Sequence, residues 1–258
     1  MTGVHHPLHR SPEFNQSSDR KGAIAGLLIA LLIIGIWATS LIFLCSLDLT
    51  QVPAWVIPFA VVWQIFLYTG LFITAHDAMH GAVFPLNPQV NNGVGTLVLL
   101  LYGLFSYKKL LRKHWLHHHH PASDLDPDFH DGKHHNPIAW YLHFMKGYWS
   151  WTRLIGLMIT FHIIHLTLHI PESNLVLFWV LPSILSSVQL FFFGTFLPHR
   201  EPETGYGSRH RATTYPLPPF WSFLACYHFG YHEEHHEYPH VPWWRLPQVY
   251  QERSVSLV

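Results

Sequence analysis

The chain has 258 residues, a formal net charge of +0 and only 12% charged residues, so nothing in its charge indicates a nucleic-acid partner. Hydrophobic residues make up 49% of it, which is typical of a membrane protein and sufficient for one sizeable domain. The two cysteines, Cys45 and Cys226, cannot form a disulfide framework or a thiolate metal site. Any metal would therefore be held by nitrogen or oxygen atoms.

Hydropathy predicts four membrane-spanning helices. A polar segment, residues 1–21, is expected to be a cytoplasmic tail without a cleavable signal peptide, and residues 22–258 are expected to form one membrane domain. Short turns separate the first span from the second and the third from the fourth, so each pair is expected to be an antiparallel hairpin. The predicted spans are residues 22–45, 53–75, 154–170 and 175–197.

The segments between the spans carry weaker patterns. Residues 94–107 are apolar but short for a crossing, which predicts a re-entrant or interfacial segment. Pro121 predicts that the preceding helix ends near His120. Residues 124–143 are predicted to be irregular. Four aromatic residues are expected to form an interfacial belt, namely Trp140, Tyr141, Trp149 and Trp151.

The placement of basic residues predicts the orientation in the membrane. The 15 Lys and Arg residues lie before the first span, between the two hairpins or after the fourth span, and none lies in either short turn. Because cytoplasmic segments are enriched in Lys and Arg, both termini and the central loop are predicted to be cytoplasmic. The predicted fold is all-α, an integral membrane protein whose four transmembrane helices form two hairpins beneath a cytoplasmic helical cap.

Three histidine clusters lie on that cytoplasmic side. Their imidazoles recur three or four residues apart, so on a helix they share one face, as metal ligands do. A lone histidine at a membrane edge is more often a packing or interfacial residue, but three such clusters on one side indicate a metal site. The clusters are His76 and His80; His114, His117 and His118; and His232, His235 and His236.

The number of clustered imidazoles indicates two metal ions, because eight exceed what one four-coordinate ion needs. Imidazole sites without thiolates suit Zn, Cu, Fe or Ni, and the spacing does not choose between them. Zinc would support hydrolysis, whereas iron would permit oxygen chemistry on a substrate that has no polar group. We favour iron, because a site at the membrane edge is well placed to act on a lipid-soluble molecule.

The sequence around the clusters resembles a known family. Residues 66–81 read FLYTGLFITAHDAMHG, and residues 226–236 read CYHFGYHEEHH with PWW at 242–244. Together with DPDFH at 126–130 and FLPHR at 196–200, these segments resemble bacterial and cyanobacterial-type β-carotene ketolases, the carotenoid 4-ketolases. That family is part of the membrane fatty-acid desaturase and hydroxylase-like di-iron superfamily. The resemblance extends from the second span almost to the C-terminus.

The resemblance implies ligands for two non-haem iron ions and no catalytic residue beyond them. One iron would be held by His76, His80, His118 and His236, and the other by His114, His117, His232 and His235. A ninth ligand is implied at the end of the fourth span, where His199 matches the superfamily's histidine. Thr195 stands where related desaturases have Asn, and His228 is the rival ninth ligand.

Other polar residues near the clusters have less defined roles. Asp77 could orient a ligand imidazole, and Asp124, Asp126 and Asp128 either do the same or belong to a solvated acidic loop. The remaining histidines are expected to pack in the third span (His162, His165 and His169) or to lie in loops and support the ligands (His119, His120, His134 and His135).

The activity implied by the resemblance is the O2-dependent oxidation of the C4 methylene of a β-ionone ring to a ketone. Two successive hydroxylations and a dehydration would convert β-carotene into echinenone and canthaxanthin. The implied partners are the carotenoids β-carotene and zeaxanthin, membrane lipid and an external electron donor such as ferredoxin. A separate donor is implied because the sequence has no dinucleotide motif and no cysteine set for an iron–sulfur cluster.

Several alternatives remain open from the sequence. Within the superfamily, a carotenoid hydroxylase that stops after one oxidation and a fatty-acid desaturase have similar histidine clusters. From a different class, a metal-binding transporter would place ionisable groups along a path through the membrane. The basic residues 108–113 either dock an acidic donor or only set the topology. The residues that would contact the substrate are not identified.

Overall fold

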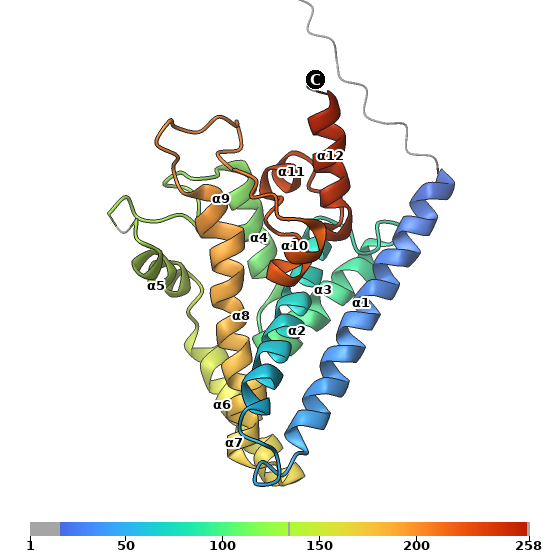
Figure 1. Cartoon of the computed structure of the whole chain (residues 1–258), viewed down its shortest axis with the longest axis vertical. Helices are drawn as coiled ribbons and strands as arrows, with labels where there is room; N and C mark the ends of the chain where they lie inside the picture. The colour runs from blue at the N-terminus through green and yellow to red at the C-terminus, as the bar shows by residue number, and fades with distance from the viewer. Residues whose placement is uncertain (1–15, 134, 257–258) are drawn as a thin grey trace, which may run out of the picture.

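The computed structural model describes residues 16–133 and 135–256, and all regular structure in those ranges is helical (Figure 1). Four helices are long and apolar enough to cross a membrane. They are α1 (Gln16–Cys45), α2 (Val56–Met79), α6 (Trp151–Leu168) and a continuous helix over Glu172–His199. The all-α prediction is therefore confirmed, as is the expectation of four helices able to span a membrane.

The last spanning helix contains two π-helical turns. It consists of α7 (Glu172–Leu175), η1 (Val176–Val180), α8 (Leu181–Phe191), η2 (Phe192–Phe196) and α9 (Leu197–His199). Proline at the start of α8 and of α9 lacks a backbone N–H, which breaks the regular hydrogen-bond ladder at these points. Each π-helical turn ends two residues before one of these prolines, and the second lies one turn before His199.

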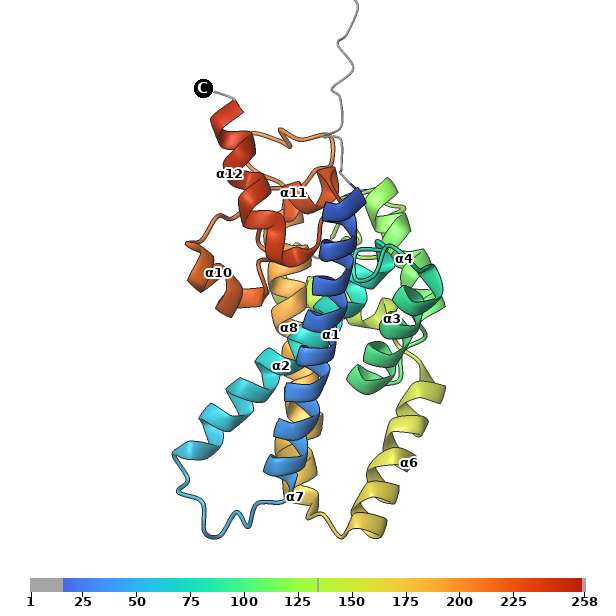
Figure 2. The same ribbon diagram turned by 90° about the vertical axis from the view of Figure 1, so that its right-hand side faces the viewer.

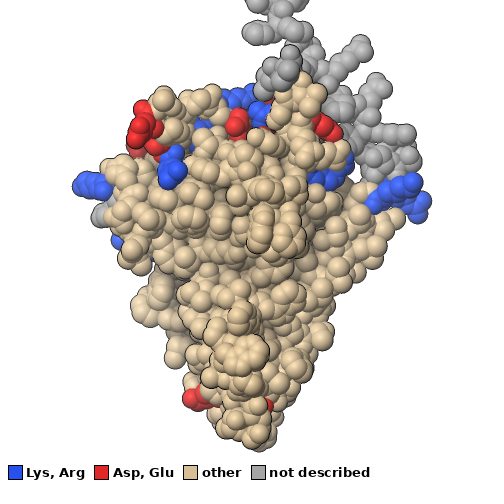
Figure 3. Space-filling view, viewed as in Figure 1, with Lys and Arg blue, Asp and Glu red and all other residues tan. Residues whose placement is uncertain are grey.

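The shorter helices gather toward one end of the spanning bundle (Figures 1 and 2). The links between α1 and α2 and between α6 and α7 lie at the opposite end. These shorter helices are α3 (Pro88–Gly103), α4 (Tyr107–His119), α5 (Pro137–Gly147), α10 (Pro219–Cys226), α11 (His232–Glu237) and α12 (Leu246–Ser256), with a 3₁₀ turn, η3, at Trp243–Arg245. On the face seen in Figure 3, all visible Lys and Arg lie at this wider end.

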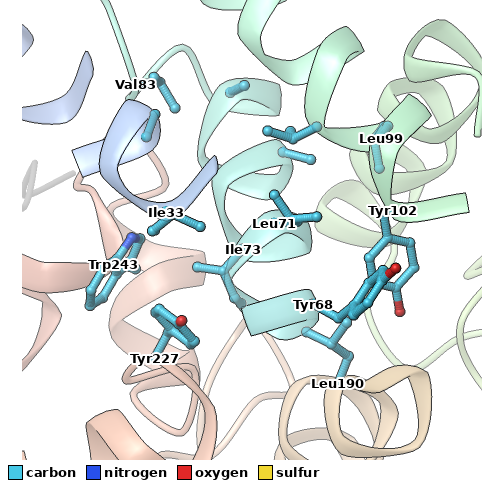
Figure 4. Close-up of a cluster of buried hydrophobic side chains, with 14 of the residues drawn as sticks. Ile33, Tyr68, Leu71, Ile73, Val83, Leu99, Tyr102, Leu190, Tyr227 and Trp243 are labelled. Carbon is cyan, nitrogen blue, oxygen red and sulfur yellow. The ribbon is translucent and has the colours of Figure 1, made fainter. Parts of the chain in front are cut away.

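Helix α2 is the centre of the packing (Figure 4). Its buried Tyr68, Leu71 and Ile73 belong to a core shared with α1, α3, α8 and the α10–α12 region. Two close approaches depend on glycine. A Cβ on Gly194 would lie 2.1 Å from the Phe229 ring, and one on Gly95 would lie 2.3 Å from the Tyr107 ring. The first contact packs the segment before α11 against the fourth spanning helix, and the second packs α4 against α3.

Helices α3 and α4 form a pair bent by 100° rather than a straight crossing. Helix α3 starts at the Asn87 side chain, which accepts hydrogen bonds from the backbone N–H groups of Gln89 and Val90. It ends at Leu104, whose φ of +55° is left-handed and turns the chain back. The apolar segment is thus too strongly bent for one regular span, in keeping with the short segment predicted for residues 94–107.

Three local predictions were wrong. The segment 124–143 is not irregular throughout, because α5 begins at Pro137, where Asn136 Oδ1 accepts the Ala139 N–H. Trp140 is not interfacial: it is 1% exposed, and its indole N–H donates to the Asp128 carbonyl at 2.9 Å. Residues 16–21 of the predicted tail are helical, because no helix breaker separates them from α1; residues 1–15 lie outside the described range.

Candidate dimetal site

The first histidine cluster lies at the end of α2. His76 is buried in the last turn, and His80 follows as the C-terminal cap, with ring centroids 5.1 Å apart. Gly81 then takes a φ of +73°, which ends the helix. Asp77 points elsewhere, because its carboxylate accepts the Trp243 backbone N–H at 3.1 Å and lies 3.8 Å from His76 Nδ1. It ties α2 to η3 and does not hydrogen-bond a ligand imidazole.

The second cluster is carried by α4, which ends at His119, close to the boundary that Pro121 predicted. His114, His117 and His118 project from its last two turns. His114 Nε2 lies 2.6 Å from His80 Nε2, so α4 meets the end of α2 through these rings. His119 and His120 are exposed and belong to neither of the histidine groups described below.

The third cluster occupies the short helix α11, and His199 of α9 lies beside it. His199 Nε2 is 3.0 Å from His232 Nε2, although the two residues come from different parts of the chain. His236 Nε2 lies 3.1 Å from His117 Nε2, and His235 Nε2 lies 3.0 Å from His118 Nε2. Helix α11 thus joins the cluster on α4 to the end of the fourth spanning helix.

All nine histidines predicted as ligands meet in two groups. In each group, one ligand-type atom per residue lies within 4.8 Å of all the others. Group 1 is His76, His80, His114, His118 and His235; group 2 is His117, His199, His232 and His236. The groups adjoin, since the His118 and His236 rings stack at 4.2 Å.

This grouping differs from the division that the resemblance implied. His114 and His235 lie in group 1 rather than with His117, and His236 lies in group 2 rather than with His76. The reason is the direction of α11, which turns His235 toward α2 and His236 toward His117 and His199. His228, the rival to His199, belongs to neither group; its ring packs beside Phe223 and Trp243 instead.

The chemistry of the two groups fits metal ions. Imidazole nitrogens face one another at 2.6 to 3.1 Å, and both ring nitrogens of the buried His76 have no hydrogen-bond partner. Burial first, and then repulsion from neighbouring imidazoles, holds the pKa values of His232, His235 and His236 well below the ordinary range. They are therefore neutral, which is the form that binds metal. A set of only nitrogen donors suits iron, zinc, copper or nickel.

Two group 2 histidines have their second ring nitrogen held by an acceptor. His117 Nδ1 lies 2.9 Å from the Asp126 carboxylate, and His199 Nδ1 lies 2.9 Å from the Arg211 carbonyl oxygen. With both Nδ1–H groups donating, each Nε2 keeps its lone pair for a metal. Burial opposes ionisation of Asp126, but His117 outweighs it and lowers the Asp126 pKa. The Arg211 contact uses a backbone carbonyl, for which the sequence offers no signal.

An apolar pocket opens beside both groups and contains about 820 Å³ of space between atoms, counting its mouth. The ligand-type residues His76, His114, His117 and His232 form part of its wall. Its other lining residues are Phe72, Met79, Tyr102, Phe105, Leu110, Asp128, Phe144, Met145, Tyr148, Ser187, Leu190, Phe191, Gly194, Thr195 and Phe229. These come from α2, α3, α4, α5, α8, η2 and the loops beside them, so no single segment of sequence could identify the pocket.

Comparison with known proteins places the chain in a family. A family model described as fatty acid desaturase matches residues 146–255. The β-carotene ketolase of Paracoccus sp. (strain PC1) is 40% identical over 228 residues, which cover 84% of this chain and 92% of that protein. The chain belongs to the β-carotene ketolase family. It is an oxidoreductase of the desaturase-like superfamily.

Other members of the ketolase family are similar over most of the chain. The β-carotene ketolase of Paracoccus sp. (strain N81106 / MBIC 01143) is 46% identical over 186 residues, covering 71% of this chain and 74% of that protein. The zeaxanthin 4-ketolase of Chlamydomonas reinhardtii is 37% identical over 243 residues, covering 88% of this chain and 54% of that protein.

Thr195 stands where related desaturases have Asn, and the structure shows where its side chain lies. Thr195 lies in η2, one turn before His199, and its side chain belongs to the pocket wall. It is not part of either histidine group. Two other predicted residues lie away from the histidine groups: Asp124 is exposed, and His165 Nδ1 lies 2.7 Å from the Ile170 carbonyl oxygen at the other end of the bundle.

Proposed function

We propose that this chain is a carotenoid 4-ketolase that converts β-carotene into echinenone and canthaxanthin. The observation that carries the proposal is the apolar, aromatic-rich pocket whose wall includes His76, His114, His117 and His232. A hydrocarbon ring without polar groups needs such a lining, and its reacting carbon must come close to the metal end. Membership of the ketolase family supports the choice of substrate.

In the proposed enzyme, groups 1 and 2 each hold one iron ion. The bound iron would supply the O2 chemistry that hydroxylates an unactivated C–H bond. Group 2 is buried in full, and the Asp126 carboxylate and the Arg211 carbonyl fix two of its rings. These contacts hold the imidazoles in place, so that little reorganisation is needed on metal binding.

The pocket side chains position the substrate. Phe72, Phe105, Phe144 and Phe191 present aromatic surface for a flat, conjugated ring, and they exclude water from the metal end. The C4 methylene must lie within about 3 to 3.5 Å of the oxidising group for reaction. The rest of the polyene extends away from the histidines toward the membrane, where the substrate is dissolved.

We further propose that the metal end and both termini face the cytoplasm, and that the spanning helices act as two hairpins. The clustering of Lys and Arg at the wider end supports this orientation (Figure 3). We assign the docking of an external electron donor such as ferredoxin to the exposed Lys108, Lys109 and Arg112 on α4. Lys113 is excluded from this surface, because its ammonium donates to the Gly147 carbonyl at 2.5 Å.

The test is expression in a bacterium that makes β-carotene, followed by chromatography of the pigments. The expected products are echinenone and canthaxanthin, and His117→Ala should abolish both because it removes a group 2 ligand together with the partner of Asp126. Hydroxylated carotenoids alone would indicate a hydroxylase, and new unsaturated lipids without keto-carotenoids would indicate a desaturase. Bound metal without O2 consumption would favour the transporter.

A further inference from the structure

One polar pair in the pocket is not needed to bind a hydrocarbon. Among the described lining residues, Asp128 is the only one with a carboxyl side chain, and Tyr148 donates a hydrogen bond from its hydroxyl to Asp128 Oδ1. An Asp128 carboxylate oxygen lies within 4.8 Å of a ring nitrogen of His117. The pair therefore stands at the metal end of the pocket, where the reacting carbon must lie.

This pair is held in position from outside the pocket. The Asp128 backbone N–H donates to Asp126 Oδ1 at 2.9 Å, and the Asp128 carbonyl accepts from the Trp140 indole at 2.9 Å. The Lys113 ammonium lies 4.2 Å from the centroid of the Tyr148 ring. When a ligand fills the apolar pocket, it displaces water from this polar pair, and the pair is held too firmly to turn to another protein group. It therefore favours a ligand that carries its own hydrogen-bonding group.

The proposed reaction produces such a group. The first oxidation replaces one hydrogen on C4 by a hydroxyl. For the second oxidation, C4 must stay in place, with its remaining hydrogen directed toward the metal end. A ring held only by apolar contacts could rotate or leave after the first step. Resting on the proposed function, we propose that Tyr148 and Asp128 bind the C4 hydroxyl of the singly oxidised ring and hold it for the second oxidation.

The chemistry of the pair matches an alcohol. The hydroxyl of the substrate can donate to the Asp128 carboxyl, and the Tyr148 hydroxyl can turn from Asp128 Oδ1 to donate its hydrogen to the C4 oxygen. Because the C4 oxygen is bonded to the reacting carbon, only groups at the metal end can reach it. Thr195, which also lines the pocket and comes one helical turn before His199, is the rival assignment. The pair would thus determine how much ketone forms relative to alcohol.

The test compares Tyr148→Phe and Asp128→Asn with the unchanged enzyme in β-carotene-producing cells, and as purified iron-loaded enzyme with 4-hydroxy-β-carotene. Loss of one such hydrogen bond should raise the ratio of 4-hydroxy to 4-keto products by about 2- to 12-fold. The KM for 4-hydroxy-β-carotene should rise by a similar factor, and the first hydroxylation should change by a smaller factor than the second. Tyr148→Phe should keep its iron. Tyr141→Phe is the matched control, because Tyr141 lies on α5, which ends just before Tyr148, but its hydroxyl bonds Ser187 Oγ and not Asp128.

Several results would overturn the inference. One is an unchanged product ratio in both variants. Another is an equal fall in the rates of both oxidations at full iron content. A third is a shift in the product ratio caused by Thr195→Val and not by the two variants. If the two variants oxidise β-carotene normally and are defective only with zeaxanthin, the pair binds the C3 hydroxyl of that substrate instead. If Asp128→Asn loses iron, the product ratio of Tyr148→Phe alone decides whether the pair binds the C4 hydroxyl. Failure of the unchanged enzyme to oxidise C4 at all would refute the proposed function instead.

Discussion

The replacement Asp126→Asn tests how the protein holds its second histidine group. Asp126 is 6% exposed, and its carboxylate accepts hydrogen bonds from three donors. These are the imidazole of His117 at 2.9 Å, the backbone N–H of Ala122 at 3.0 Å and that of Asp128 at 2.9 Å. Asparagine keeps one acceptor oxygen and puts an NH2 donor where the other was. At least one of the donors then faces another donor, and His117 loses its charged partner.

The size of the effect follows from these contacts. A hydrogen bond to a charged group contributes about 1.5 to 3 kcal/mol. Losing one such partner behind a ligand histidine typically lowers metal affinity by about 10- to 100-fold. Because the Asp126 carboxylate does not face the pocket, the defect should appear in metal retention before it appears in product choice. Folding should be maintained, since Asn fills nearly the same volume.

The assay is iron content per chain by elemental analysis after incubation with increasing chelator. Asp126→Asn should release iron at a chelator concentration lower by about 10- to 100-fold than the unchanged protein. Asp124→Asn is the matched control, because Asp124 is exposed in the same loop and lies in neither histidine group. Iron release at the same chelator concentration in Asp126→Asn and the unchanged protein would refute the role assigned to this carboxylate.

Three further predictions concern the packing and the metal. Gly194→Ala should destabilise the protein by about 1 to 3 kcal/mol, because the added methyl would lie 2.1 Å from the Phe229 ring. Thermal unfolding in detergent measures this loss. The control is Gly35→Ala, which should be neutral because no atom lies within 4 Å of the new Cβ. His199→Ala should lower the iron content, whereas His228→Ala should leave it unchanged, and the opposite result would restore His228 as the ninth ligand. Removing the metal by chelation should lower the unfolding temperature, and reloading should restore it; equal temperatures would show that the groups bind no metal in the folded state.

Much of this architecture follows from local sequence patterns. The apolar stretches predicted the number of spanning helices, and the spacing of His114, His117 and His118 predicted the helix that carries them. Pro121 predicted where α4 ends, to within a residue or two. These features depend on neighbours in the chain, which the sequence shows directly. The helix at Pro137 was missed because its short, mixed pattern does not stand out from the polar segment before it.

Features that join distant segments of the chain were harder to predict from the sequence. The buried position of Trp140 and the carbonyl of Arg211 behind His199 depend on how the loops pack over the bundle. The role of Asp126 was left open beside that of Asp124, because both follow His117 at short range and only one of them faces it. The pocket wall is built from six helices, the π-helical turn η2 and the loops beside them, so it has no signature in any one of them.

The sequence by itself determined which residue types could bind metal and on which helix faces they lie, because helical periodicity directs side chains three and four residues apart to one side. It also indicated the ketolase family, which the comparisons then established. Only the tertiary structure decided how the nine histidines divide into groups of five and four. That division depends on how α11 is oriented relative to α2 and α4. This orientation is set by packing between distant segments, such as Phe229 against Gly194, and not by spacing along the chain.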